Sequence, residues 1–275
     1  MAFYPLQFAI GIILAALVVF ISDRLKLLSR NGALAALLLG IVVFGLGGLR
    51  WAIVLLVFFL SSSGLSRLFR KRKEDPEKNY AKGSTRDAWQ VVANGGLAGT
   101  FALLHFFFPQ SSWIWITFCA AFAAANADTW ATEIGALAKK PPRLITTLQP
   151  VEPGTSGAIS WLGTIAAFTG ALLVGLTASF VDPFAAEQSA WLVLVVVTIS
   201  GGVGSLVDSW LGATLQVVYH CPLCDKDTEK FPTHGCGTET VLVRGIKWLN
   251  NDFVNIICTI SSAGIALLMT WLSIH

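Results

Sequence analysis

The residues best suited to chemistry lie in the middle of the chain, in the stretch NADTWATEIGALAKK that covers residues 126–140. This stretch ends a long apolar run and contains Asp128 and Glu133. Carboxylates inside a membrane-spanning helix are rare, because each costs roughly 2.5–3.5 kcal/mol on insertion scales, and they usually face a polar interior. The four-residue spacings of Asp128 with Thr132 and of Thr129 with Glu133 place each pair on one helix face.

Three cations lie at the end of this stretch and just after it, at Lys139, Lys140 and Arg143. The order of charges puts carboxylates just inside a membrane surface and cations just outside it. Mg²⁺ prefers one or two carboxylates together with phosphate oxygens, so the pattern predicts a site where a metal ion holds a phosphorylated ligand. The alternative is the end of an ordinary helix whose basic side chains reach the membrane surface.

A second intramembrane carboxylate lies in SLVDSWLGATLQ, residues 205–216. Asp208-Ser209-Trp210 repeats the pattern of Asp128-Thr129-Trp130, eighty positions earlier, as in the remnant of an internal repeat. Two nearby carboxylates need a cation between them, or one of them must be protonated. Asp128 and Asp208 are therefore the first candidate Mg²⁺ ligands.

The segment NNDFVN, residues 250–255, opens the last apolar run on the same side of the membrane. Asp252 is the third candidate Mg²⁺ ligand, and Asn251 and Asn255 are candidate contacts to the phosphorylated ligand. An ordinary N-cap role for Asp252 is the alternative.

The turn PGTSG, residues 153–157, is a candidate phosphate-binding loop. Glycine permits close approach of the backbone to a ligand, and a helix that starts directly after the turn would offer free N–H groups. The candidate residues are Gly154, Thr155 and Ser156. The alternative is that Thr155 or Ser156 is only an N-cap.

A polar stripe at the entry to an earlier apolar run is formed by Arg86, Gln90 and Asn94, which recur every four residues. We predict ligand contacts for Arg86 and Asn94. Hydrogen bonding between helices is the alternative.

The hydrophilic segment His220–Leu249 contains Cys221-x-x-Cys224 and His234-x-Cys236. Four soft ligands at this spacing fit a closed tetrahedral zinc site, which is structural because protein fills every position. Free thiols or redox pairing are the alternatives, and a disulfide is disfavoured if the segment is cytoplasmic.

A membrane-embedded helical bundle must position these residues. Of the 275 residues, 55% are hydrophobic and only 13% are charged, which excludes a soluble domain. We predict an all-α polytopic membrane protein, a single transmembrane domain over residues 1–275 with a cytoplasmic, zinc-binding insert at 220–249. The N-terminus lacks a basic region with a cleavage site, so its first apolar run is expected to be retained. The eight expected spans are Leu6–Ile21, Asn31–Leu46, Trp51–Phe69, Asp87–Phe108, Trp113–Ala138, Gly157–Val181, Ala190–Tyr219 and Asn251–Ile274. Glycines are expected to break the second span at Gly47-Gly48 and to interrupt the seventh at residues 201–204.

The distribution of basic residues predicts the orientation. The loops after spans one, three, five and seven hold 3, 8, 3 and 4 Lys or Arg, whereas Arg50 is alone after span two and the loops after spans four and six hold none. Lys and Arg mark the cytoplasmic side, so both termini are expected outside. The candidate groups then share the cytoplasmic face, in a membrane of the bacterial inner or thylakoid type, where nucleotides are available.

The ordered motifs RDAWQVVANGG, NADTWATEIG, PGTSGAISWLGT, GSLVDSWLGATLQ, the Cys-x-x-Cys segment and NNDFVN resemble the DUF92/TMEM19 integral membrane family over nearly the whole chain. The plant branch of that family includes phytyl-phosphate kinase, which serves tocopherol and phylloquinone synthesis. The family also resembles the CTP-using polyprenol and phytol kinases. Their signature is similar to Ala127-Asp128, Ala131, Gly135, Lys139, Arg143, Gly154 and Thr155, although this chain lacks a glycine before Asp128.

The resemblance implies a kinase that transfers the terminal phosphoryl group of CTP or UTP to a prenyl monophosphate, such as phytyl or geranylgeranyl phosphate. Asp128, Asp208 and Asp252 would then hold Mg²⁺ with support from Glu133, and Arg86 would bind the acceptor phosphate. The expected nucleotide or phosphate contacts are Asn94, Asn126, Lys139, Arg143, Gly154, Thr155, Ser156, Asn251 and Asn255.

Two other functions stay open. Cytidylyl transfer to a lipid phosphate would use a similar site, and an ion-coupled transporter would also have buried carboxylates and glycine-rich helices. No nucleic acid partner is expected.

Overall fold

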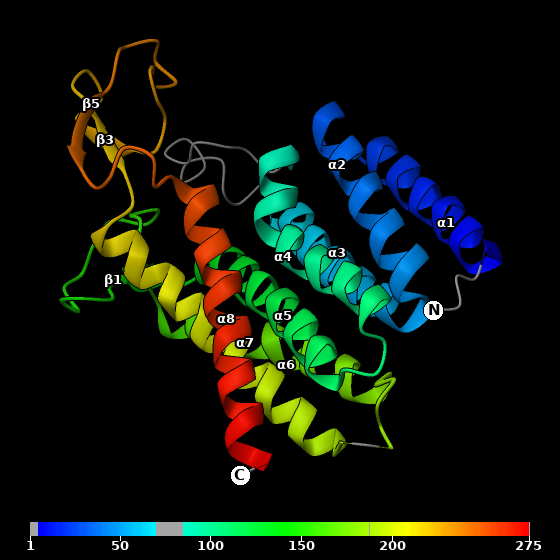
Figure 1. The fold of residues 1–275 in the computed structure, drawn as a ribbon. Coiled ribbons are helices and arrows are strands. Elements are labelled where there is room, and N and C mark those ends of the chain that lie inside the picture. Colours follow the sequence, from blue (N-terminus) through cyan, green and yellow to red (C-terminus); the bar gives the residue numbers. More distant parts are fainter. Residues whose placement is uncertain (1–4, 70–84, 187, 275) are drawn as a thin grey trace.

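The computed structural model describes residues 5–186 except 70–84, and residues 188–274. This part of the chain forms eight α-helices (Figure 1). They are α1 (Pro5–Arg24), α2 (Arg30–Gly40), α3 (Leu49–Phe69), α4 (Ala88–Phe107), α5 (Ser112–Gly135), α6 (Trp161–Phe180), α7 (Ala190–Thr214) and α8 (Asn251–Ile274). The prediction of an all-α membrane protein with about eight transmembrane helices is confirmed. Most of the basic loop expected at 70–86 lies outside the described residues.

Six of the described helical segments are long and apolar enough to cross a membrane: α1, α2 with its continuation to Gly47, α3, α6, α7 and α8. The other two, α4 and α5, are also 20 and 24 residues long but carry more polar side chains. In α5 these include Asp128 and Glu133 near its end. A carboxylate is tolerated at such a position when other helices shield it from lipid.

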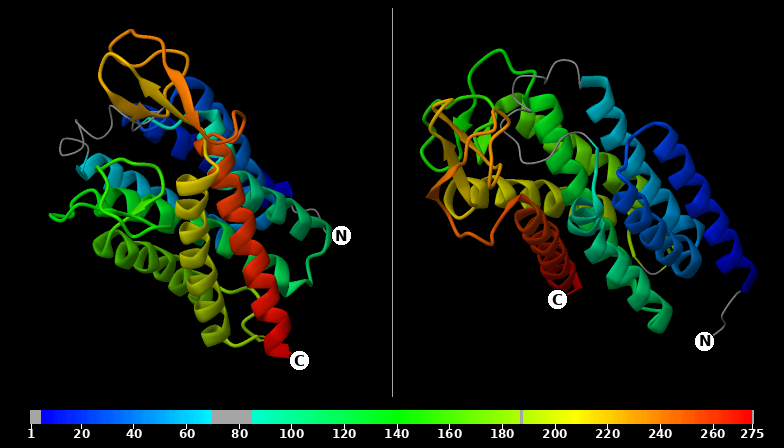
Figure 2. Two further views of the ribbon diagram at one scale, coloured as in Figure 1. Left: turned by 90° about the vertical axis from the view of Figure 1, so that its left-hand side faces the viewer. Right: turned by 90° about the horizontal axis from the view of Figure 1, so that it is seen from above.

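Helix α5 is shielded from lipid in this way, because it lies inside the bundle. It contacts α3, α4, α6, α7 and α8 (Figure 1). Every residue from Ile114 to Ala127 is buried, and the alanines at 120–121 and 123–125 let neighbouring helices approach closely. By contrast, α1 lies at the outer edge of the bundle and exposes most of its apolar side chains, as a lipid-facing helix does (Figure 2).

The glycine-rich breaks predicted in two spans have different outcomes. The segment after α2 continues as a π-helix, Ile41–Gly47, and stops at Gly48, whose φ of 80° favours glycine. The interruption expected at residues 201–204 is wrong, because α7 is continuous there. Those glycines instead allow close packing: a Cβ on Gly201 would lie 2.6 Å from the Cβ of Ala123 in α5.

The connections that follow the odd-numbered helices gather at one end of the bundle. Arg86, which precedes α4, exchanges backbone hydrogen bonds with Leu27 and Ser29 after α1. Arg244, between α7 and α8, donates to the backbone of Ser156, between α5 and α6. The prediction that this end is cytoplasmic stays a prediction.

Two small β-sheets lie at this end of the bundle. The segment predicted as a hydrophilic insert contains β3 (Val218–Cys221), β4 (Lys226–Thr228) and β5 (Val241–Arg244), which form an antiparallel sheet in the order β4-β3-β5. It lies over the adjoining ends of α7 and α8 (Figure 1). A two-stranded ribbon, β1 (Arg143–Leu144) with β2 (Ala158–Ile159), closes the proline-rich loop after α5.

Candidate functional site

An open pocket of about 1080 Å³ lies at this end, between α5, α6, α7 and the start of α8. Asp128 and Thr132 line it from α5, and Asp208 and Ser209 line it from α7. The two aspartates of the repeated tripeptide therefore lie in the same cavity, although eighty positions separate them in the sequence. We call this cavity the carboxylate pocket.

One oxygen in the carboxylate pocket has no hydrogen-bond partner among the residues that the structure describes. The Oδ2 atom of Asp208 is buried, and no hydrogen-bond donor from the described residues reaches it. An ionised carboxylate buried in this way is costly unless a cation or a proton compensates it. Asp128 lies in the same pocket, so the donor set fits a hard divalent cation such as Mg²⁺.

The Pro153–Gly157 turn forms another wall of the carboxylate pocket. Gly157 has a φ of 81°, and a Cβ there would lie 2.2 Å from the backbone nitrogen of Ala213 in α7. Only glycine allows the turn to approach α7 so closely. The predicted turn thus lies beside the paired aspartates, and Gly157 allows it to pack directly on α7.

The helix that was expected to start at Gly157 starts four residues later. Strand β2 intervenes, and α6 begins at Trp161. Its N-cap is Ser160, whose hydroxyl accepts a hydrogen bond from the Gly163 N–H at 3.1 Å. The N-cap alternative for Thr155 and Ser156 is therefore wrong. Ser160 and the first turn of α6 themselves line the carboxylate pocket.

The lysine that reaches this pocket is Lys140, whereas Lys139 and Arg143 are not among the described residues that line it. Arg143 belongs to β1, and its Nη1 donates to the carbonyl of Leu148 within the same loop at 2.6 Å. The phosphate contacts predicted for Lys139 and Arg143 stay predictions, and their neighbour Lys140 is the lysine that the structure places at the pocket.

Glu133 and Asn126, both predicted site residues, face α3 instead. Ser66 donates a hydrogen bond to Oε1 of Glu133 at 2.8 Å, and Ser61 donates to Oδ1 of Asn126 at 2.9 Å. The amide of Asn126 donates in turn to the carbonyl of Gly170 in α6 at 2.8 Å. At 3.6 residues per turn, positions 128 and 133 lie roughly 140° apart around the helix, which separates the two carboxylates.

Arg86 and Asn94 lie away from the carboxylate pocket, beside an apolar cavity of about 610 Å³ between α1, α2, α3 and α4. The Arg86 guanidinium packs over the rings of Phe58 and Phe59. Burial lowers the pKa of Arg86 to about 10, and Glu133 partly offsets this shift. The structure therefore does not bring Arg86 to the paired aspartates.

The rest of the Arg86–Asn94 stripe bonds within its own helix. Asp87 and Gln90 form a capping box at the start of α4. The Asn94 amide donates to the carbonyl of Gln90 at 3.0 Å. These contacts lie within α4 and its N-terminal cap. They are not the hydrogen bonds between helices that were considered as the alternative for this stripe.

At the start of α8, Asn251 lines the carboxylate pocket. Asp252 and Asn255 are buried but are not among the described residues that line it. The side-chain oxygen of Asn250 accepts hydrogen bonds from the backbone N–H groups of Asp252 and Phe253, at 3.0 and 3.2 Å. Asn250 therefore caps α8, so the N-cap role considered for Asp252 is wrong, and its metal-ligand role stays a prediction.

A larger hollow of about 1540 Å³ adjoins the carboxylate pocket and shares the walls Pro153–Ser156 and Glu229 with it. The insert forms its other side, through residues that include His220, Asp227 and Arg244. Burial lowers the pKa of Arg244, and Asp227 partly offsets this shift.

Three residues of this region were missed from the sequence. Arg244 donates from Nη1 to the carbonyl of Ala213 at 2.6 Å, and Gln216 donates to Glu229 at 2.7 Å. Of the three, only Gln216 could have been noticed in the sequence, because it is the polar residue that ends the motif at residues 205–216. Arg244 and Glu229 come from the insert, where nothing in the sequence distinguishes them from other charged residues.

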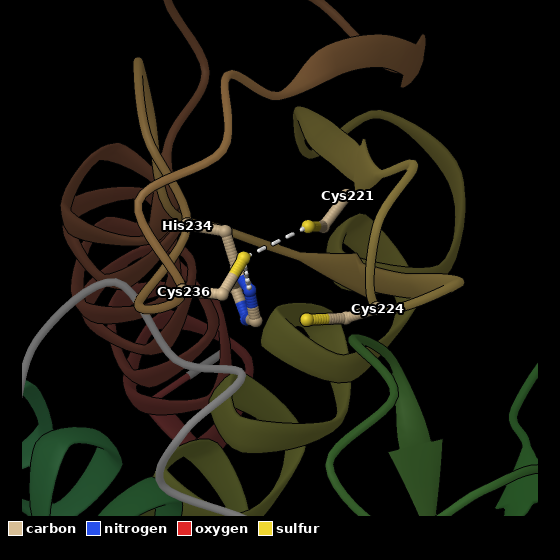
Figure 3. A group of neighbouring side chains, drawn as sticks. All are labelled: Cys221, Cys224, His234 and Cys236. Atoms are coloured by element: carbon tan, nitrogen blue, oxygen red, sulfur yellow. Dashed lines mark hydrogen bonds between the residues drawn. The ribbon is translucent and has the colours of Figure 1, made fainter.

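The four predicted zinc ligands lie together in the insert: Cys221, Cys224, His234 and Cys236 (Figure 3). All five cysteines of the chain are free, so the insert holds no disulfide. Hydrogen bonds from Thr238 and His234 lower the pKa of Cys236 to about 5.

Comparisons with known proteins relate most of the chain to one family. The family model described as integral membrane protein DUF92 matches residues 13–263. Protein PGR of Arabidopsis thaliana is 31% identical over 90% of both chains. An uncharacterized membrane protein of Methanocaldococcus jannaschii is 30% identical over 75% of this chain and 82% of its own. The chloroplastic protein VTE6 of Arabidopsis thaliana is 25% identical over 88% of this chain and 65% of its own. No solved structure matches.

Proposed function

Because the chain belongs to the DUF92 integral membrane family, we propose that it is a membrane phosphotransferase that converts a prenyl monophosphate to the diphosphate. The phosphoryl donor would be a nucleoside triphosphate, CTP or UTP. The motifs that resemble phytyl-phosphate kinase support this proposal, and so does the relationship to the chloroplastic protein VTE6.

One observation carries the proposal: two intramembrane aspartates share a polar pocket with a glycine-rich turn and a lysine. Asp128 and Asp208 supply the anionic side of the pocket, while Lys140 supplies the cation and the backbone of Gly154 and Ser156 supplies the potential N–H donors. This combination suits phosphate oxygens that are held partly by protein and partly by a divalent cation.

In this proposal the residues of the chain bind and orient two anions. Asp128 and Asp208 would hold Mg²⁺, which when bound would neutralise part of the negative charge on the transferred phosphoryl group. Lys140 and the backbone of Gly154 and Ser156 would bind the nucleotide phosphates, and the adjoining hollow has room for the nucleoside. Positioning and charge neutralisation are the main contributions that phosphoryl transfer requires of a protein.

The reaction needs no strong general base. An oxygen of the prenyl phosphate forms the new bond to the terminal phosphorus of the nucleotide, and the bond from that phosphorus to the bridging oxygen breaks. The leaving group is the nucleoside diphosphate, and the products are that diphosphate and the prenyl diphosphate. The attacking oxygen is already anionic, which agrees with the absence of a histidine among the described residues that line the carboxylate pocket.

The position of the carboxylate pocket favours this reaction over transport. Carriers built from repeats usually bind their substrate near the membrane midplane. Here the pocket lies at the end of the bundle, between loop residues 153–160 and the insert residue Glu229. Arg86 lies outside this pocket, beside the cavity between α1, α2, α3 and α4, so the acceptor phosphate is not assigned to Arg86.

The test is an assay of membranes that contain the protein, with phytyl or geranylgeranyl monophosphate and each nucleoside triphosphate in turn. Label on the terminal phosphate of the nucleotide should appear in the prenyl diphosphate. Membranes with Asp208→Asn at equal protein level are the matched control.

Two results would reject the proposal. Label on the innermost phosphate that enters the lipid with release of pyrophosphate would indicate cytidylyl transfer. A failure to form the diphosphate from any nucleotide, with folded protein present, would exclude the phosphotransferase for these acceptors.

A further inference from the structure

We propose that Cys221, Cys224, His234 and Cys236 bind one structural zinc ion, and that this ion holds the insert as a wall of the carboxylate pocket. The side chains of these four residues turn toward a common centre (Figure 3). One ligand atom from each lies within 4.8 Å of every other.

The distances in this cluster match a tetrahedral site. The Sγ atoms of Cys221 and Cys236 are 3.5 Å apart, and Nδ1 of His234 lies 3.3 Å from Sγ of Cys236. Two sulfurs that each lie about 2.3 Å from a tetrahedral ion are about 3.8 Å apart. The cluster therefore needs only small shifts to enclose a zinc ion.

The backbone around the cluster repeats one feature in both halves. Asp225 follows Cys224 with a φ of 52°, and Gly237 follows Cys236 with a φ of 86°. Each half thus turns tightly, in the left-handed region, directly after its second ligand. At the second turn, the backbone N–H and the hydroxyl of Thr238 both hydrogen-bond to Cys236. Donors of this kind orient a thiolate ligand and stabilise its charge.

The insert needs such an ion because it has little hydrophobic core of its own. Its third strand exposes Val241 and Val243, which are 61% and 54% accessible. Tyr219 is buried, but its stacking partner Phe231 is 66% accessible. Units of this size usually require a metal or a disulfide to fold stably, and the cysteines of this chain are free.

The metal cluster is linked to the pocket through the sheet of the insert. Cys221 ends β3, which pairs with β5 on one side and β4 on the other. Arg244 at the end of β5 donates to the carbonyls of Ala213 and Ser156, and Glu229 directly after β4 accepts from Gln216. Zinc would therefore order both residues that fasten the insert to α7 and to the glycine-rich turn.

Metal content tests the site, with matched controls from the same chain. Protein purified without chelator should contain about one zinc per chain, and this should hold for His220→Ala and Cys258→Ser, which lie outside the cluster. His234→Ala and Cys224→Ser should lose the zinc. Zinc that remains in both of these variants would overturn the proposal, as would metal-free wild-type protein whose cluster cysteines are all alkylated in the folded state.

If the cluster variants do not accumulate, Co²⁺ substitution of the wild-type protein decides the question. Tetrahedral Co²⁺ with three thiolates should give strong visible and near-ultraviolet absorption, and its absence would overturn the site.

Hydrogen exchange tests the link to the pocket. Removal of zinc should speed exchange at 216–229 and at 153–157, while α1 stays unchanged as the internal control. Unchanged exchange at 153–157 would overturn the role of zinc as support for the pocket wall. Neither readout depends on catalytic activity, so failure of this proposal and failure of the phosphotransferase proposal are distinguishable.

Discussion

The two polar faces of α5 differ in what their side chains contact. On the side of α3, Asn126 bonds to a serine hydroxyl and to a backbone carbonyl, and Glu133 accepts a hydrogen bond from Ser66. On the side of α7, Asp128 and Asp208 line an open pocket, and Oδ2 of Asp208 has no hydrogen-bond partner from the described residues.

This difference separates two uses of polar residues inside a membrane protein. Hydrogen bonds between helices stabilise the bundle, and the residues that make them are held by their protein partners. Carboxylates that share a cavity have capacity left for a cation or another ligand. Mutations on the two faces of α5 should therefore affect different properties.

The largest difference should come from neutralising one carboxylate on each face. Asp208→Asn should fold and lose diphosphate synthesis by about 10²-fold or more, because a clamped phosphoryl group loses its neutralising cation. Glu133→Gln is the matched control on the other face and should keep turnover near that of the wild type. Both are measured as initial rates in membranes with equal amounts of protein.

The opposite ranking would reverse the assignment of the two faces. A folded Asp208→Asn protein with normal rates, beside an inactive Glu133→Gln protein, would place the reaction on the α3 side.

A substitution in the turn should mainly affect stability and the shape of the pocket. Gly157→Ala puts a Cβ at a φ of 81° and 2.2 Å from the backbone of Ala213, so the turn must move away from α7. Strain of about 1–3 kcal/mol should lower the Tm by roughly 5 °C or more, with weaker nucleotide binding. Gly64→Ala in α3, where a Cβ meets no atom within 4 Å among the described residues, should leave the Tm unchanged or raise it. Equal Tm values for the two variants would show that the turn does not pack on α7.

The sequence was most informative where a pattern repeats. The shared tripeptide on α5 and α7 correctly indicated that Asp128 and Asp208 lie in one place, since both helices run in the same direction. Helical spacing also predicted which residues share a face, such as Asp128 with Thr132. It could not predict which neighbouring helix that face contacts, so it did not indicate that Glu133 bonds to Ser66 of α3.

Contacts between distant loops could not be predicted from the sequence for a related reason. Arg86 is held by backbone hydrogen bonds to the loop after α1, and Arg143 is part of the β1–β2 ribbon. Neither arrangement has a signal in the local sequence. Arg244 illustrates the reverse case, because an unremarkable arginine of the insert contacts the glycine-rich turn only after the sheet has formed.

The smallest effect should distinguish two adjacent lysines. Lys140→Met should raise the KM for the nucleotide by about five- to tenfold, because one charge-assisted contact to phosphate is lost. Lys139→Met removes the same charge one residue away, from a side chain that does not line the carboxylate pocket, and should leave the KM unchanged. Equal effects would mean that the lysines act only through the general positive charge of this surface.

The most direct test of the paired-aspartate site is Mn²⁺ binding, because Mn²⁺ prefers the same oxygen ligands as Mg²⁺ and is visible by electron paramagnetic resonance. Purified protein with a non-hydrolysable CTP analogue should bind Mn²⁺, and the doubly substituted Asp128→Asn/Asp208→Asn protein, if folded, should lose this binding. The Glu133→Gln variant should retain it. Mn²⁺ binding of unchanged affinity and stoichiometry in the folded double variant would contradict the assignment of these two aspartates as the metal ligands.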